Sequence, residues 1–199
     1  VTEFRDFVAA QGLNLFGVLS ANQVEQERTG YARRSIEDSS SILLCGSGGR
    51  SHWQHVEKVQ LQSTTAEENP IEAGAWKSIE EGLPLLPEGS FQLPLQEVNQ
   101  YNLRLLGEAA GFGRISPELL MMIHPIYGPW ISIRSMVVVS FQLPVTKSLD
   151  DYDPCTHCEK PCLQACPAHA YSQENPWNVT LCGEHRLKEK TIENDCADA

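Results

Sequence analysis

Four cysteines close together near the end of the chain are the residues whose chemistry is easiest to identify. They form the run Cys155-x2-Cys158-x3-Cys162-x3-Cys166, and Pro167 follows directly. Thiolates in short loops of this kind hold iron–sulfur clusters, and in two-cluster ferredoxins the cysteine before a proline ligates the other cluster. Proline fixes its φ angle and ends the turn, which directs Cys166 away from the other three. The spacing therefore predicts an iron–sulfur loop.

Two other kinds of site use closely spaced cysteines. Zinc knuckles usually place two ligands, a gap and two more, whereas these four form a single run. Disulfide pairs are the third interpretation. The gap between Cys158 and Cys162 holds three residues where the commonest ferredoxin run has two. The extra residue lengthens the loop without removing a ligand, so it indicates a variant of the iron–sulfur loop.

Composition narrows the classes of protein that this chain could represent. The net charge of −11 argues against nucleic-acid binding, which needs clustered Lys and Arg. No apolar stretch is long enough to span a membrane, and no signal segment opens the chain. Cysteines are sparse outside the cysteine-rich end, unlike those of a secreted disulfide scaffold. We therefore expect a cytoplasmic protein. It begins at Val1 and ends soon after Cys196, so we expect further sequence beyond these ends.

The amino-acid composition of the chain changes near residue 150, just before the cysteines. Apolar runs come before this point, whereas cysteines and short turns follow it, which predicts an α/β core over 1–149 and an iron–sulfur module over 150–199. The 131–143 run alternates and then becomes continuously apolar, so we expect a central strand in an antiparallel or mixed sheet covered by helices. The other expected elements are helices over 2–12, from Ser51 and over 91–110, and strands over 15–20 and 41–45.

Two loops of the core are candidates for ligand binding. Gly46, Gly48 and Gly49 separate a strand from a helix, where backbone amides could approach a phosphate; a plain tight turn is the alternative. The second loop, 123–134, carries two prolines and a glycine, which rigidify it. Its His124, Tyr127 and Trp130 could form a flat wall, and Arg134 could bind an anion or a core carboxylate.

The second loop resembles a known family segment. The sequence His124-Pro-Ile-Tyr-Gly-Pro-Trp-Ile-Ser-Ile-Arg134 is similar to the His-Pro-x-aromatic-Gly-x-Trp-x-x-x-Arg segment of cobalamin-processing proteins of the methylmalonic aciduria type C family. A core of this kind followed by a ferredoxin-type module resembles the epoxyqueuosine reductases and reductive dehalogenases. The resemblance implies a flavin-reductase-like α/β sandwich.

The same resemblance implies what the core and the module bind. The core ligand would be a corrinoid such as cobalamin, with FMN as the second choice, near His124, Tyr127, Gly128, Trp130 and Arg134, together with the loop of Gly46 and Gly48. A counterpart of the proton-donating carboxylate of epoxyqueuosine reductase is not evident. The tRNA-reading helical repeat domain of that enzyme is also absent from this sequence, so its reaction does not transfer.

The number of clusters follows from how the cysteines are shared. Cys155, Cys158 and Cys162 are expected on a first cluster and Cys166 on a second. Cys182 and Cys196 would join the second cluster, as in epoxyqueuosine reductase. Two 4Fe-4S clusters need eight thiolates and the module has six cysteines, so we expect the remaining ligands beyond Ala199. One cluster with the other cysteines free is the alternative.

Two functions from different classes fit these features. In the first, clusters reduced by an external electron donor pass electrons to a corrinoid or flavin in the core, which acts on a small molecule. In the second, the protein is an electron carrier or corrinoid-binding module without turnover of its own.

Overall fold

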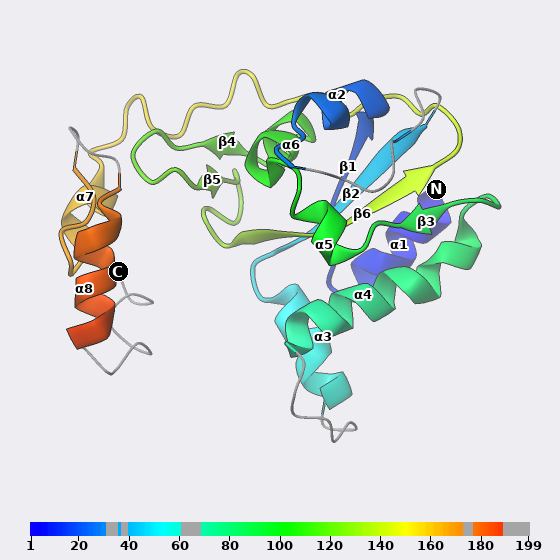
Figure 1. Ribbon diagram of the computed structural model, residues 1–199, viewed down its shortest axis with the longest axis horizontal. Coiled ribbons are helices and arrows are strands. Elements are labelled where there is room, and N and C mark those ends of the chain that lie inside the picture. Colours follow the sequence, from blue (N-terminus) through cyan, green and yellow to red (C-terminus); the bar gives the residue numbers. More distant parts are fainter. Residues whose placement is uncertain (31–35, 37–39, 61–68, 173–176, 189–199) are drawn as a thin grey trace.

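The computed structural model describes residues 1–30, 36, 40–60, 69–172 and 177–188. An α/β core comes first. Its elements are α1 (Thr2–Ala10), β1 (Leu15–Ser20), α2 (Ala21–Gln26), β2 (Ser41–Gly48), α3 (Ser51–Gln60), α4 (Pro70–Gly82), η1 (Leu83–Leu85), β3 (Phe91–Gln92), α5 (Leu95–Val98), α6 (Leu103–Ala109), β4 (Arg114–Ile115), β5 (Met122–Ile123) and β6 (Ile131–Val139). The cysteine segment adds α7 (Pro161–Ala165) and α8 (Val179–Lys188), which lie to one side of the core (Figure 1).

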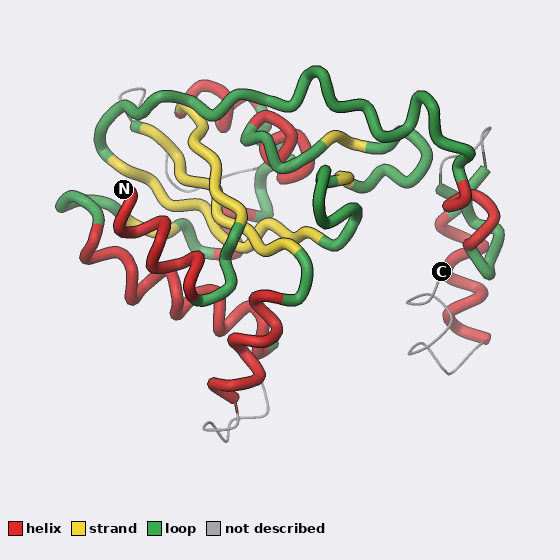
Figure 2. The backbone as a smooth tube through the Cα atoms, turned by 180° about the vertical axis from the view of Figure 1, so that it is seen from behind, coloured by secondary structure: helices red, strands yellow, loops and turns green. Residues whose placement is uncertain are grey.

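The central sheet has the strand order β1-β2-β6-β3, and all of its pairs are antiparallel. Side chains of a strand alternate between the two faces of a sheet, and here both faces are covered (Figure 2). Ile42 and Leu44 of β2 pack in one core cluster, with α6 residues. Leu43 and Cys45 pack in the other, with residues of α1 and α4. The predicted α/β sandwich with an antiparallel sheet is confirmed.

The predicted central strand forms, but it is shorter than its apolar run. Val137, Val138 and Val139 are 0%, 4% and 0% exposed, as expected for a strand buried on both faces. β6 ends at Val139 because that residue pairs with Ser41, the first residue of β2. Beyond this point the ladder has no partner strand. Instead, the Leu143 N–H donates to the Ser41 side chain at 2.8 Å.

The long helix expected over 91–110 is wrong. The segment forms β3, α5 and α6 instead. Pro94 lacks an N–H and disfavours helix in the residue before it, so no helix can run through from residue 91. The Asn102 side chain then accepts from the Leu105 N–H and caps a separate helix. Local capping chemistry therefore divides an apolar pattern that looked continuous.

The second strand also differs from its prediction. Gly46 and Gly48 were expected to end it, yet β2 runs on to Gly48, with a bulge between Cys45 and Gly46. Glycine is needed there for close approach: a Cβ on Gly46 would lie 2.8 Å from the Ser132 carbonyl oxygen. The turn begins at Gly49, whose φ is +65°. Across the described ranges, no helix is both long and apolar enough to cross a membrane.

Candidate functional site

A tight turn between β5 and β6 presents the histidine, tyrosine and tryptophan of the second loop. His124 and Gly128 exchange backbone hydrogen bonds of 2.8 and 2.9 Å, and Gly128 has a φ of +56°, which glycine adopts without strain. The Nδ1 atom of His124 accepts from the N–H groups of Ile126 at 2.9 Å and Tyr127 at 3.2 Å. Burial lowers the pKa of His124. The imidazole therefore holds the turn together through Nδ1, which leaves Nε2 for a ligand.

Tyr127 lies against the end of β2. A Cβ on Gly48 would sit 2.2 Å from Cδ2 of the Tyr127 ring, so only glycine allows this packing. Asn14 fixes the arrangement, because its amide donates to the Tyr127 hydroxyl at 3.0 Å and its Oδ1 accepts from the Gly48 N–H at 2.7 Å. The His124 ring packs on Tyr127 with centroids 4.8 Å apart. The structure thus brings His124, Tyr127 and the glycine segment together.

Two apolar side chains of this turn are exposed to solvent. Ile126 is 79% exposed and Trp130 is 66% exposed. The backbone of Trp130 is nevertheless fixed, because its carbonyl accepts from the Gly49 N–H at 2.8 Å. The turn lies at the end of the core nearest the cysteine segment (Figure 1). An exposed tryptophan on a rigid backbone is suited to stacking on a flat ligand.

Arg134 lies apart from the other residues of the second loop. Its Nε donates to Ser47 Oγ at 3.4 Å. Successive residues of a strand face opposite sides of the sheet. The Ser47 side chain therefore points away from the face on which Tyr127 packs against Gly48. On the opposite face, Arg134 lines a cavity of ≈ 240 Å³ together with residues of α4, β3 and α5. None of His124, Tyr127 and Trp130 lines that cavity.

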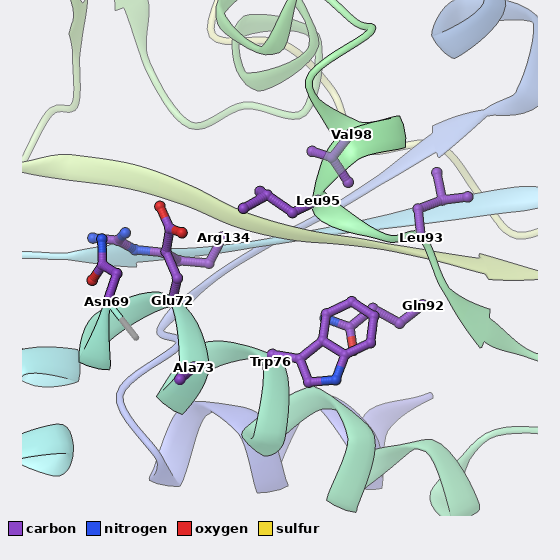
Figure 3. A pocket seen from close by; sticks show the side chains of 9 residues that line it. All are labelled: Asn69, Glu72, Ala73, Trp76, Gln92, Leu93, Leu95, Val98 and Arg134. Atoms are coloured by element: carbon purple, nitrogen blue, oxygen red, sulfur yellow. The ribbon is translucent and has the colours of Figure 1, made fainter. Parts of the chain in front are cut away.

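The Arg134 cavity has one polar end and one mixed end. Figure 3 shows Arg134 beside Glu72 and Asn69 at the first and Trp76 with Gln92 at the second. Burial lowers the pKa of Arg134, while the nearby Glu72 raises it. The Gln92 amide donates to Ser135 Oγ at 2.9 Å, and its Oε1 is buried without a partner among the described residues. A guanidinium here could take a carboxylate or phosphate group.

The cysteine loop is shaped by backbone interactions that direct N–H groups at sulfur. Lys160 adopts the left-handed conformation with φ +56°, and its N–H donates to Cys158 Sγ at 3.4 Å. The N–H of Ala170 donates to Cys166 Sγ at 3.5 Å. Before the first cysteine, the Asp153 carboxylate accepts from the N–H groups of Cys155 and Thr156. Hydrogen bonds to sulfur are among the features that tune iron–sulfur clusters.

Cys158 influences the thiols of two other cysteines of the loop. Burial raises the pKa values of Cys155 and Cys162, and the neighbouring Cys158 raises both further. Burial also raises the pKa of Tyr171, with added contributions from Cys166, Cys182 and Cys162. All of these cysteines are free thiols. The donor set and its N–H···S contacts suit an iron–sulfur cluster. However, no group of three or more His, Cys, Asp or Glu in the described part of the chain is already arranged around a metal position.

Cys196, an expected ligand of the second cluster, lies outside the described residues. Cys45 is completely buried on β2, and burial raises the pKa of its thiol to about 12. A thiol that keeps its proton so strongly in an apolar core is inert.

Sequence reasoning missed three polar residues of the core. Asn14 anchors Tyr127, and Ser116 and Glu118, in the β4–β5 connection, contact the cysteine loop through Cys155 and Lys160. Nothing in the sequence near Asn14 marks its role, since its partners lie 34 to 113 residues away. The Ser116-Pro117-Glu118 segment reads as an ordinary turn.

Comparison with known proteins gives structural relatives only. No family model and no curated protein matches the sequence. The epoxyqueuosine reductase from Streptococcus thermophilus aligns over 86% of this chain and 53% of its own, at 15% identity and a TM-score of 0.54. The catabolic reductive dehalogenase NpRdhA, in complex with 3-bromo-4-hydroxybenzoic acid, aligns over 81% of this chain and 24% of its own, at 16% identity and a TM-score of 0.52.

A third relative is the B12-trafficking protein CblC from C. elegans. It aligns over 74% of both chains at 17% identity, but its TM-score of 0.48 is too low to carry an argument. The chain spans about half the length of the epoxyqueuosine reductase that it matches. At these identities the likeness establishes the fold alone. The chain therefore has the α/β fold of epoxyqueuosine reductase and reductive dehalogenase.

Proposed function

We propose that this chain is part of an iron–sulfur redox protein that passes electrons from 4Fe-4S clusters to a corrinoid, or else a flavin, bound at the core. The observation that carries the proposal is the run of free cysteines in a loop that contacts the core directly, through Cys155 and Ser116 at 3.4 Å. The shared fold with two reductases supports a redox role. When bound, the clusters would supply electrons one at a time.

Different cysteines of the chain would hold the two clusters. Cys155, Cys158 and Cys162 would hold the first cluster, and Cys166, Cys182 and Cys196 the second. The backbone N–H groups of Lys160 and Ala170 would donate to the ligand sulfurs and spread their charge. These assignments follow the spacing of the cysteines, with each N–H···S contact as added support.

The core ligand would lie on the β5–β6 turn. Trp130 and Ile126 offer an apolar surface there, and Nε2 of His124 carries the proton of the neutral ring because Nδ1 is an acceptor. His124 would therefore donate a hydrogen bond to the ligand. It would not offer an electron pair to cobalt. Gly46, Gly48 and Gly128 would act indirectly, by allowing the turn and the Tyr127 packing. Arg134 belongs to a separate cavity, where it would hold an anionic group.

Titration with cobalamin and with FMN tests the core part of the proposal. We expect Trp130→Ala to weaken binding of the preferred cofactor roughly tenfold or more, since the loss of one stacking surface is worth about 1.4 kcal/mol. Trp76→Ala is the matched control, because Trp76 is 40% exposed but lies in the Arg134 cavity. Weaker binding in Trp76→Ala and Arg134→Gln, with Trp130→Ala unaffected, would instead place the ligand in that cavity.

The alternative function is an electron carrier without turnover. It keeps the clusters and lacks the core ligand. If neither cobalamin nor FMN bound to the anaerobic, iron-loaded protein, the core part of the proposal would be wrong and this alternative would stand.

A further inference from the structure

The cysteine loop is fastened to the core by two contacts on either side of Cys158. Cys155 Sγ lies 3.4 Å from Ser116 Oγ, and Lys160 Nζ lies 2.5 Å from Glu118 Oε1. Ser116 is 2% exposed and the Glu118 side chain is 11% exposed. Both core residues sit in the connection between β4 and β5. The pairing with Lys160 lowers the pKa of Glu118, so the carboxylate stays ionised.

The hydroxyl of Ser116 has all of its hydrogen-bonding capacity engaged. Its oxygen accepts from the Leu119 N–H at 3.2 Å and from the Cys155 thiol, and its proton goes to Glu118 Oε2 at 3.3 Å. Its own backbone N–H donates to the Met121 carbonyl at 2.8 Å. Ser116 is therefore fixed from both sides, and its oxygen is held against the cysteine sulfur.

This arrangement changes when Cys155 binds a metal. A metal-bound cysteine is a thiolate without a proton, so the contact can persist only if Ser116 O–H donates to the sulfur. In the structure the Ser116 hydroxyl donates to Glu118 Oε2 at 3.3 Å while Lys160 pairs with Oε1. We expect a thiolate at Cys155 to draw the hydroxyl away from this long contact, because Lys160 continues to hold the carboxylate.

We infer that Ser116 is a positioning residue for the iron–sulfur loop: it fixes Cys155 against the core and, through a hydrogen bond to the ligand sulfur, raises the reduction potential of the first cluster. The inference rests on the proposed function, because it concerns the cluster that Cys155 would hold. A hydrogen bond to sulfur stabilises the reduced cluster, which carries one more negative charge than the oxidised one. Its loss therefore makes the cluster harder to reduce.

The test is a redox titration of the anaerobic, iron-loaded protein followed by electron paramagnetic resonance. We expect Ser116→Ala to keep its iron and to show a more negative midpoint potential. Ser116→Thr, which retains the hydroxyl, should stay near the wild-type value. Ser90→Ala is the matched control, because the Ser90 hydroxyl donates to the Pro87 carbonyl in a turn of the core. Equal potentials in Ser116→Ala and wild type would overturn the inference.

A second measurement separates this inference from the proposed function. Hydrogen exchange of the metal-free protein reports on the amides of Cys155 and Thr156, which bond to Asp153. Faster exchange there in Ser116→Ala than in Ser90→Ala supports the positioning role even if wild-type protein binds no iron. Unchanged exchange rejects that role. Absence of iron from the wild type rejects the proposed function and the tuning of potential. If Ser116→Ala alone loses its iron while Ser116→Thr stays loaded, the positioning role is upheld.

Discussion

Two residues of the β5–β6 turn, His124 and Tyr127, stabilise the local backbone as well as lining the candidate ligand site. The sequence placed His124 in a flat wall near a core ligand, but its Nδ1 accepts two backbone N–H groups. Tyr127 looked like part of an open wall, but its ring covers Gly48 and its hydroxyl accepts from Asn14. Trp130 keeps an exposed side chain and is therefore the residue whose substitution tests ligand binding most directly.

Protonation of His124 should weaken the fold. Burial lowers its pKa below the ordinary 6.5, so the unfolded chain takes up the proton first as pH falls. The stabilisation is complete above about pH 6.5 and is lost progressively as pH falls from there through the pKa of the folded state. Burial also lowers the pKa of His55, so its protonation opposes folding in the same way. We therefore expect the free energy of unfolding to decrease between about pH 7 and about pH 5.

The contribution of His124 can be isolated with His124→Asn. An asparagine oxygen can accept from the same backbone N–H groups without titrating. In urea unfolding, the variant should lose less stability than wild type over the same pH range. The same pH dependence in both proteins would show that His124 does not contribute.

Gly48 should tolerate no side chain. A Cβ would meet the Tyr127 ring at 2.2 Å, so Gly48→Ala must displace the ring or the strand, and we expect a loss of about 1–3 kcal/mol in the free energy of unfolding. Gly183→Ala is the control, because nothing lies within 4 Å of its Cβ position. That change in helix α8 should be neutral or slightly stabilising. Equal stability of Gly48→Ala and wild type would contradict the close packing of Tyr127 on Gly48.

At the scale of elements, the β4–β5 connection links the core to the cysteine loop. Glu118 and Lys160 form a close ion pair whose side chains are 11% and 34% exposed, whereas Arg114 and Asp150 are 3.7 Å apart with the Asp150 side chain 80% exposed. Exposed pairs contribute little because solvent screens them. The first pair should therefore hold the loop, and the second should matter little.

Charge reversal tests the role of that ion pair. We expect Glu118→Lys to release the loop, which limited proteolysis within 153–160 would report as faster cleavage. Combining it with Lys160→Glu should restore protection, because the opposite charges face each other again. Asp150→Asn is the matched control and should leave cleavage unchanged. If the double variant were cleaved as fast as Glu118→Lys, the pair would not be what holds the loop.

At the scale of the whole molecule, the number of clusters tests the iron–sulfur part of the proposed function. Iron analysis of the full-length gene product, prepared without oxygen, should give about eight irons per chain for two 4Fe-4S clusters. Cys166→Ala should lower the content towards about four, since it removes a ligand of the second cluster only. Cys45→Ala should leave it unchanged, because Cys45 is buried in the core. Four irons in the wild type would favour one cluster, and stoichiometric zinc without iron would exclude both arrangements.

The sequence alone determined the features that depend on local order. The alternating and then continuous apolar pattern of 131–139 defines a central strand, because a period of two places successive side chains on opposite faces. The change of composition near residue 150 predicts a boundary between the core and the cysteine segment. The cysteine spacing predicts a ligand loop, since ligand spacing is a property of a short stretch of chain; that prediction awaits iron analysis.

Only the tertiary structure decided which distant residues meet. Arg134 was grouped with Tyr127 because the two are close in sequence. In the structure Arg134 contacts Ser47, whereas Tyr127 packs on Gly48. Ser47 and Gly48 are successive residues of β2 and therefore face opposite sides of the sheet. Ser116 reaches Cys155 across 39 residues, and Asn14 reaches Tyr127 across 113. Such contacts depend on strand register and chain return, which follow from the packing of the whole core and leave no pattern in the neighbouring sequence.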